Sequence, residues 1–154
     1  MNKRIAALHD ALAKVADPIL RESLCCLLSH FHPEWGDREP LDVFNRLLAK
    51  NLGRAGSRKT GHTDVRAEQI ASRREQWTTA DLSTLRRGHS DPRGVDVACP
   101  IVLAEYADET RVLDGNHRIN RWVNENDSRM HDVIIHTIAK AVGFVDLPPD
   151  TNDA

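Results

Sequence analysis

The chain has 154 residues, of which 40% are hydrophobic and 29% charged, and its formal net charge at pH 7 is -2. This composition suits one folded domain, or a small domain with an appendage, and it excludes a strong overall attraction for nucleic acid. The charge is uneven, because bases outnumber acids between residues 46 and 93, whereas acids predominate from residue 105 onward. The basic middle predicts an affinity for phosphates or nucleic acid, and a solvated helix face next to a linker is the alternative.

The cysteines and the hydropathy pattern predict the cellular compartment in which the protein is found. The chain has three cysteines, Cys25, Cys26 and Cys99, and the two adjacent ones cannot readily bridge each other. We therefore expect thiols in buried apolar positions of a protein in a reducing compartment, and the lack of a CxxC pair argues against structural zinc. No apolar run approaches about 18 residues, and the N-terminus lacks the apolar core of a signal peptide. These features predict a cytoplasmic protein with no membrane partner.

The first third of the chain is predicted to be helical. Apolar residues recur at helical spacing in three stretches before residue 53. Asp17 is placed to cap the second helix and Pro18 to occupy its first position, while residues 32–37 are typical of a turn. We expect residues 1–60 to form a helical bundle or a cap laid across a second domain. Its apolar stripes could also bind a protein partner.

A second domain is expected over residues 61–146, after a linker rich in glycine and charge at residues 53–61. Residues 65–76 predict a polar helix, and Thr79 is expected to cap a short helix that ends at Gly88. Apolar runs at 101–103, 112–113 and 133–135 predict strands, the last of them buried on both faces. A hairpin turn is expected at 107–110, a helix from Asn116, another helix over 137–142, and a disordered tail at 147–154. The pattern predicts an α+β fold with an N-terminal helical segment and a small mixed sheet.

Candidate functional side chains are most concentrated at residues 114–118, Asp-Gly-Asn-His-Arg, between an expected strand and an expected helix. Gly115 would let the backbone approach a ligand, and the amides of Asn116 and His117 would face an anion at the helix N-terminus. The guanidinium of Arg118 can donate a bidentate pair of hydrogen bonds to phosphate, and His117 suits proton transfer near neutral pH. Asp114 could orient Arg118, contact a ribose or help to hold Mg²⁺. The alternative is a plain strand-to-helix turn capped by Asp114 or Asn116.

The apolar strand, the Asp-Gly-Asn-His-Arg turn, the amphipathic helix and the second apolar strand together resemble the ParB/sulfiredoxin-like superfamily, over roughly residues 62–140. Its members carry Gly-x-x-Arg or Asp-Gly-His-x-Arg at this turn and use it to bind nucleotide phosphates. The known activities are CTP hydrolysis, ATP-dependent sulfinic acid reduction and ADP- or ATP-dependent serine phosphorylation, and some relatives are described as nucleases. The turn of this chain has no cysteine, so sulfinic acid reduction is not expected here.

The resemblance implies a phosphate-handling enzyme that binds ATP, ADP or CTP, with Mg²⁺, and hydrolyses the nucleotide or transfers a phosphoryl group. In such an enzyme the catalytic residues would be Asp114, His117 and Arg118. The nucleotide would be bound by residues 115–118, and the metal would be contacted by Asp114. Further candidates are His89 and Arg93 over the phosphate, and Asp64 or Glu68 as general base. Two alternatives stay open: a nucleic-acid-binding protein or nuclease that uses the same turn on backbone phosphate, and a non-catalytic interaction module.

Overall fold

The computed structural model describes residues 9–35, 40–52, 65–85, 99–106 and 109–139, with the side chains of 29–35, 49, 50 and 52 excepted. Several predicted features lie outside these residues. They are the linker at 53–61, the end of the short helix at Gly88, the tail at 147–154, and three candidate site residues, Asp64, His89 and Arg93.

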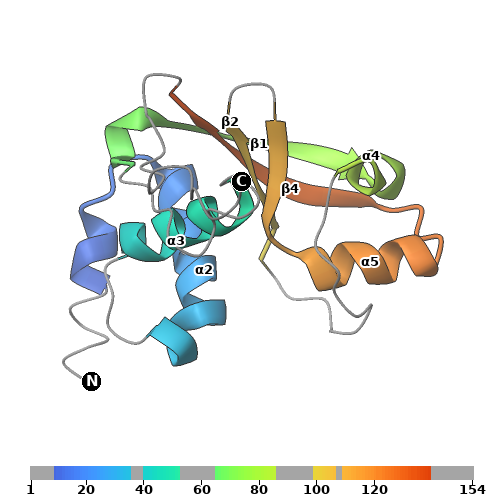
Figure 1. Ribbon diagram of the computed structural model, residues 1–154, viewed down its shortest axis with the longest axis horizontal. Helices are drawn as coiled ribbons and strands as arrows, with labels where there is room; N and C mark the ends of the chain where they lie inside the picture. Colours follow the sequence, from blue (N-terminus) through green and yellow to red (C-terminus); the bar gives the residue numbers. More distant parts are fainter. Residues whose placement is uncertain (1–8, 36–39, 53–64, 86–98, 107–108, 140–154) are drawn as a thin grey trace, which may run out of the picture.

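A four-stranded mixed sheet forms the centre of the molecule (Figure 1). Its strands are β1 (Ile70–Thr78), β2 (Ile101–Tyr106), β3 (Glu109–Asp114) and β4 (Met130–Ile138), in the order β1-β4-β2-β3. β4 runs antiparallel to β1 and parallel to β2, while β2 and β3 form an antiparallel hairpin. The expected α+β class and small mixed sheet therefore agree with the structure.

Helices cover both faces of this sheet. A short helical stretch at residues 9–13, α2 (Pro18–Trp35) and α3 (Pro40–Leu52) lie on one face, and α4 (Thr79–Ser83) and α5 (Asn116–Asn124) on the other. Alternate side chains along each strand point to opposite faces, so β2 contributes Val102 and Ala104 to one core and Ile101 and Leu103 to the other. β4 lies between two strands, and the predicted burial of residues 133–135 on both faces is confirmed.

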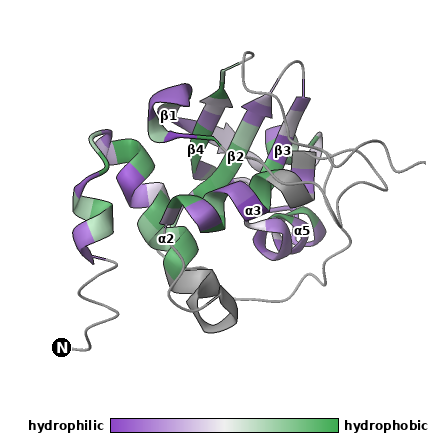
Figure 2. Cartoon of the chain, turned by 60° about the vertical axis from the view of Figure 1, so that its left-hand side comes forward, coloured by the Kyte–Doolittle hydropathy of each residue, from purple (hydrophilic) through white to green (hydrophobic). Residues whose placement is uncertain are grey.

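The helices of the first third share their core with the sheet. Leu24 of α2 and Phe44 of α3 are fully buried in the same cluster as Val102 and Ile138. Figure 2 shows hydrophobic colouring along much of α2 and on β2, which this core joins. The described residues of these helices therefore pack on the sheet.

The start of α2 follows the sequence prediction, but its end does not. Asp17 Oδ1 accepts hydrogen bonds from the amides of Ile19 (2.9 Å) and Leu20 (3.3 Å), which confirms Asp17 as the N-cap. The helix then continues to Trp35, so the break expected from residue 32 is wrong up to that point. The apolar residues of α2 as far as Leu28 pack in one core with the sheet, and the helix stabilised there continues through the turn-prone residues.

Residues 65–76 do not form the expected helix. They form a single 3₁₀ turn, Ala67–Gln69, followed by strand β1. Helix-forming side chains such as Arg74 are accommodated because β1 is an edge strand of this sheet, where charged side chains face solvent and pair across strands. The helix expected from residue 137 is also wrong at its start, since β4 continues to Ile138.

The short helix after β1 begins one residue earlier than predicted. Thr78, not Thr79, is the N-cap of α4, and its hydroxyl accepts from the Asp81 amide at 3.0 Å. The Asp81 carboxylate accepts in return from the Thr78 amide, which completes a capping box. Thr79 is then available for a contact with His131.

Candidate functional site

The candidate site is the sharp turn between β3 and α5, which we call the 114–118 turn. Gly115 adopts φ +118°, a left-handed conformation that L side chains rarely adopt, and it occupies the N-cap position of α5. A Cβ built on Gly115 would overlap the Cδ1 atom of Ile101. The glycine is therefore required by the backbone conformation and by close packing against β2.

Arg118 lies beneath this turn and connects it to the start of β2. Its side chain is 8% exposed. Nη1 donates to the carbonyl oxygen of Cys99 at 2.6 Å, and Nη2 lies 3.5 Å from the carbonyl oxygen of Pro100 and 3.7 Å from Asp114 Oδ2. Arg118 therefore holds the first turn of α5 against the residues that precede β2, a structural role that sequence reasoning did not foresee.

The other residues of the turn are placed differently. His117 is exposed, whereas Asn116 is partly buried. Within the described part of the chain, Asn116 Oδ1 is a buried side-chain oxygen for which no hydrogen-bond donor is found. The helical hydrogen bonding of α5 begins with the bond from the Ile119 amide to Gly115 O at 2.9 Å, so the amides of 116–118 precede it. A buried acceptor and a helix N-terminus thus lie side by side.

The five predicted site residues, 114–118, are consecutive in the sequence and so lie together. They differ in burial and in the groups that they contact. Asp114 is 12% exposed and faces Arg118, as expected for an orienting carboxylate. In the described ranges no three His, Cys, Asp or Glu residues are grouped so as to hold a metal ion. The catalytic, nucleotide-binding and metal-binding roles of these residues stay predictions.

The remaining candidates are not brought to this turn by any contact among the described residues. Glu68 lies in the 3₁₀ turn before β1, is exposed, and pairs with Arg66 at 3.4 Å. The basic residues of β1 are also paired. Arg73 contacts Glu75 and Glu105, which raises the pKa of the guanidinium, and Arg74 contacts Asp132 and Glu22.

Two buried histidines on β4 were missed by sequence reasoning. His136 bonds Ser72 Oγ through Nδ1 (2.7 Å) and Ser23 Oγ through Nε2 (2.8 Å), and burial lowers its pKa to about 4. His131 stacks on Trp122 with ring centroids 3.7 Å apart. Both histidines lie in or next to a run of β-branched residues. No spacing between residues in the sequence indicates that such a histidine is buried and hydrogen-bonded.

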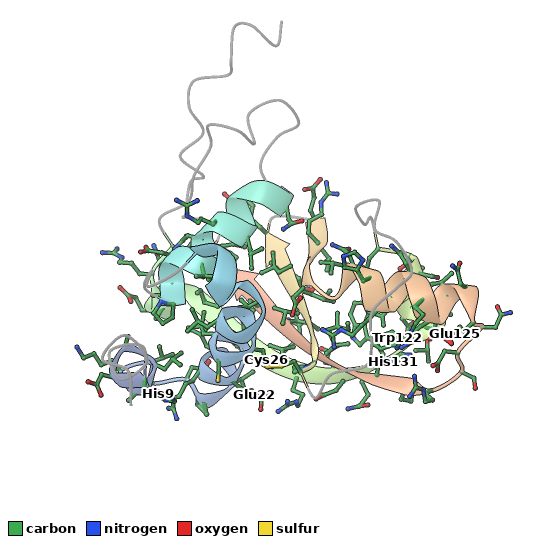
Figure 3. The ribbon with its side chains drawn as sticks, turned by 90° about the horizontal axis from the view of Figure 1, so that it is seen from below. His9, Glu22, Cys26, Trp122, Glu125 and His131 are labelled. Atoms are coloured by element: carbon green, nitrogen blue, oxygen red, sulfur yellow. A yellow bond between two sulfur atoms is a disulfide. The ribbon has the colours of Figure 1, made fainter. Side chains whose placement is uncertain are left out.

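Among the described residues, neither histidine is part of a catalytic triad. In a triad the nucleophile and the carboxylate occupy opposite ring nitrogens. At His131 the Thr79 hydroxyl (2.8 Å) and Asp127 (3.8 Å) both face Nε2, and the two partners of His136 are both hydroxyls. These contacts join α4, α5 and α2 to the sheet. Figure 3 shows Trp122 and His131 close together beside α5.

The cysteines differ from their prediction. Cys26 of α2 is joined to Cys99 by a disulfide, and Cys25 is exposed. The expected set of buried free thiols is therefore wrong in this structure, because the α2 helix lies next to the start of β2, a proximity that the 73-residue separation in sequence conceals.

Searches against protein-family models, curated proteins and solved structures found no match to this chain. The resemblance to the ParB/sulfiredoxin-like superfamily therefore rests on the sequence motif alone. Among the described helices, none has the length and apolar character needed to cross a membrane.

Proposed function

We propose that the 114–118 turn binds the phosphate groups of a nucleotide (ATP, ADP or CTP) and that the protein hydrolyses this nucleotide or transfers its phosphoryl group. The observation that carries the proposal is the start of α5 directly after left-handed Gly115, beside the buried oxygen of Asn116. A helix N-terminus attracts anions through its amide groups and its dipole. The sequence resemblance supports the same assignment.

Each residue of the turn would have its own part in this function. The amides of the first turn of α5 would donate to phosphate oxygens. The buried oxygen of Asn116 accepts, and a sugar hydroxyl of the nucleotide would supply the donor. Exposed His117 would contact the phosphate or move a proton to the leaving oxygen. Arg118, fixed by Cys99 O and Asp114, would supply positive charge under the turn and keep its geometry.

The expected Mg²⁺ has no complete site in the described residues. Asp114 is the carboxylate at the turn, and it already faces the Arg118 guanidinium. Mg²⁺ is commonly held by one or two carboxylates together with substrate phosphates and water. The ion would therefore have to arrive with the nucleotide, and we assign no step of the reaction to it.

The pairing of the two β1 arginines gives no support to nucleic acid as the ligand. The arginines of β1, which belong to the basic stretch of the sequence, are paired with Glu75, Glu105, Asp132 and Glu22. Nucleic-acid binding needs several basic groups that are available to displace counterions from the phosphates. Paired arginines contribute little to such a surface.

Isothermal titration calorimetry of the full chain with ATP, ADP, CTP and GTP, each with and without Mg²⁺, tests the proposal. His117→Ala should weaken binding about 5- to 70-fold, the loss of about 1–2.5 kcal/mol expected for a charge-assisted hydrogen bond. His9→Ala is the matched control, because His9 is exposed and lies far from α5 (Figure 3). Tight binding that is equally insensitive to both substitutions would place the nucleotide elsewhere.

A further inference from the structure

The disulfide and the candidate site share one residue. Cys26, labelled in Figure 3, is buried in α2, and its partner Cys99 lies two residues before the start of β2. The backbone carbonyl of Cys99 accepts the 2.6 Å hydrogen bond from Arg118 Nη1. A covalent bond between α2 and Cys99 therefore fixes the carbonyl against which the first turn of α5 is held.

This linkage crosses the sheet. α2 packs on one face with the first core and α5 on the other face with the second core, and Cys99 lies where the chain enters β2 between them. Among the described residues, the guanidinium also lies 3.5 Å from Pro100 O and 3.7 Å from Asp114. The bond to the Cys99 carbonyl is the shortest of these contacts.

We propose that the Cys26–Cys99 disulfide is a reversible redox switch that controls the order of the 114–118 turn. The part of the proposal that concerns ligand affinity rests on the proposed function, and the part that concerns the turn does not. The oxidised chain is the competent form, since its 114–118 turn is already ordered and less ordering is needed on binding. Reduction frees Cys99 from α2 and loosens the turn.

The chemistry requires a dithiol reductant. One thiolate of the reductant attacks the sulfur of Cys99, a half-buried residue, rather than that of buried Cys26, and forms a mixed disulfide. The Cys26 sulfur leaves with the electron pair of the broken bond and takes up a proton. The second thiol of the reductant then displaces Cys99, which is also protonated. The protein gains two thiols, and the reductant becomes a disulfide.

Hydrogen–deuterium exchange of the full chain before and after reduction with dithiothreitol tests the switch, with thiol counting by mass spectrometry to establish each state. We expect exchange at the Ile119 amide, the first that is bonded within α5, to accelerate about tenfold on reduction. The ATP dissociation constant should rise by a similar factor, within the usual range of coupling between sites. Cys99→Ser should show the reduced behaviour at all redox conditions. Cys25→Ser, adjacent but outside the bond, should behave as the parent chain.

The outcomes separate the two proposals. Accelerated exchange without any nucleotide binding would refute the proposed function and keep the switch. Nucleotide binding with unchanged exchange and an unchanged dissociation constant in the two states would refute the switch and keep the function. A chain that retains three titratable thiols in an oxidising glutathione buffer would also refute the switch.

Discussion

At Gly115 the backbone conformation and the packing exclude a side chain for separate reasons. The left-handed φ strains any L residue, and the Ile101 side chain fills the place of a Cβ. Gly115→Ala should therefore lower the free energy of unfolding by about 1–3 kcal/mol. Urea denaturation measures this loss.

A second substitution separates the two causes. Ile101→Val removes the Cδ1 atom that the new Cβ would meet, but leaves the backbone strain. In the Ile101→Val background, Gly115→Ala should cost less than in the parent, and the remaining cost reports the strain. Equal costs in both backgrounds would show that the contact with Ile101 does not matter.

His136 makes stability depend on pH. Its pKa is about 4 in the folded chain, because burial disfavours the imidazolium, against 6.5 for an ordinary histidine. The unfolded state therefore binds more protons between these values, so stability is complete above about pH 6.5 and falls as the pH decreases to about 4. The loss approaches about 1.4 kcal/mol per pH unit, or about 3 kcal/mol in all.

The effect is best measured by denaturation between pH 6.5 and 5, above the range in which most carboxylates titrate. His136→Gln should remove most of the slope in this interval. An identical slope in the parent and in His136→Gln would show that another group is responsible.

At the scale of the element, Arg118 connects α5 to β2. Arg118→Ala would leave the Cys99 carbonyl and the Asp114 carboxylate without this donor in a site that is largely buried. We expect a loss of about 2–4 kcal/mol in the free energy of unfolding. Arg118→Lys keeps the charge and should recover part of the loss, while Arg121→Ala, partly exposed on the same helix, should cost under about 1 kcal/mol. If Arg118→Ala and Arg121→Ala lowered the free energy of unfolding equally, Arg118 would not be the residue that anchors α5 to the start of β2.

The disulfide should also stabilise the folded chain. Cys26 and Cys99 are 73 residues apart, and closing a loop of this length restricts the unfolded chain. Cys99→Ser should lower the free energy of unfolding by about 2–4 kcal/mol under oxidising conditions. In the presence of dithiothreitol the parent and the variant should unfold at nearly the same urea concentration. A persistent difference under reduction would mean that the serine itself disturbs the site.

Elements with a strong local pattern were predictable from the sequence, and those fixed by tertiary pairing were not. The Asp17 cap, the hairpin and α5 each follow from residues close together in the chain. The sequence predicts a polar helix over residues 65–76, and only the register of β1 with β4 makes residues 70–78 a strand. The disulfide and the buried histidines depend on contacts far apart in sequence, which composition and spacing do not encode.

At the scale of the whole molecule, the N-terminal helices and the sheet depend on each other. Val102, Ala104, Leu113 and Ile138 are covered by α2 and α3. A chain that lacks residues 1–60 would expose these side chains as one apolar patch, so we expect it to aggregate or to lose its cooperative unfolding transition. Size-exclusion chromatography detects the aggregation, and thermal denaturation detects the loss of cooperative unfolding. A truncated chain that is monomeric and as stable as the parent would contradict the shared core.

The central claim is that nucleotide phosphate binds at the start of α5, and amide chemical-shift mapping tests it most directly. A ¹H–¹⁵N correlation spectrum of the oxidised full chain, titrated with ATP, reports every amide separately. The account predicts the largest shifts at Gly115, Asn116, His117 and Arg118, with saturation at the dissociation constant found by calorimetry. Saturable shifts confined to other residues, or no shifts at millimolar ATP, would contradict it.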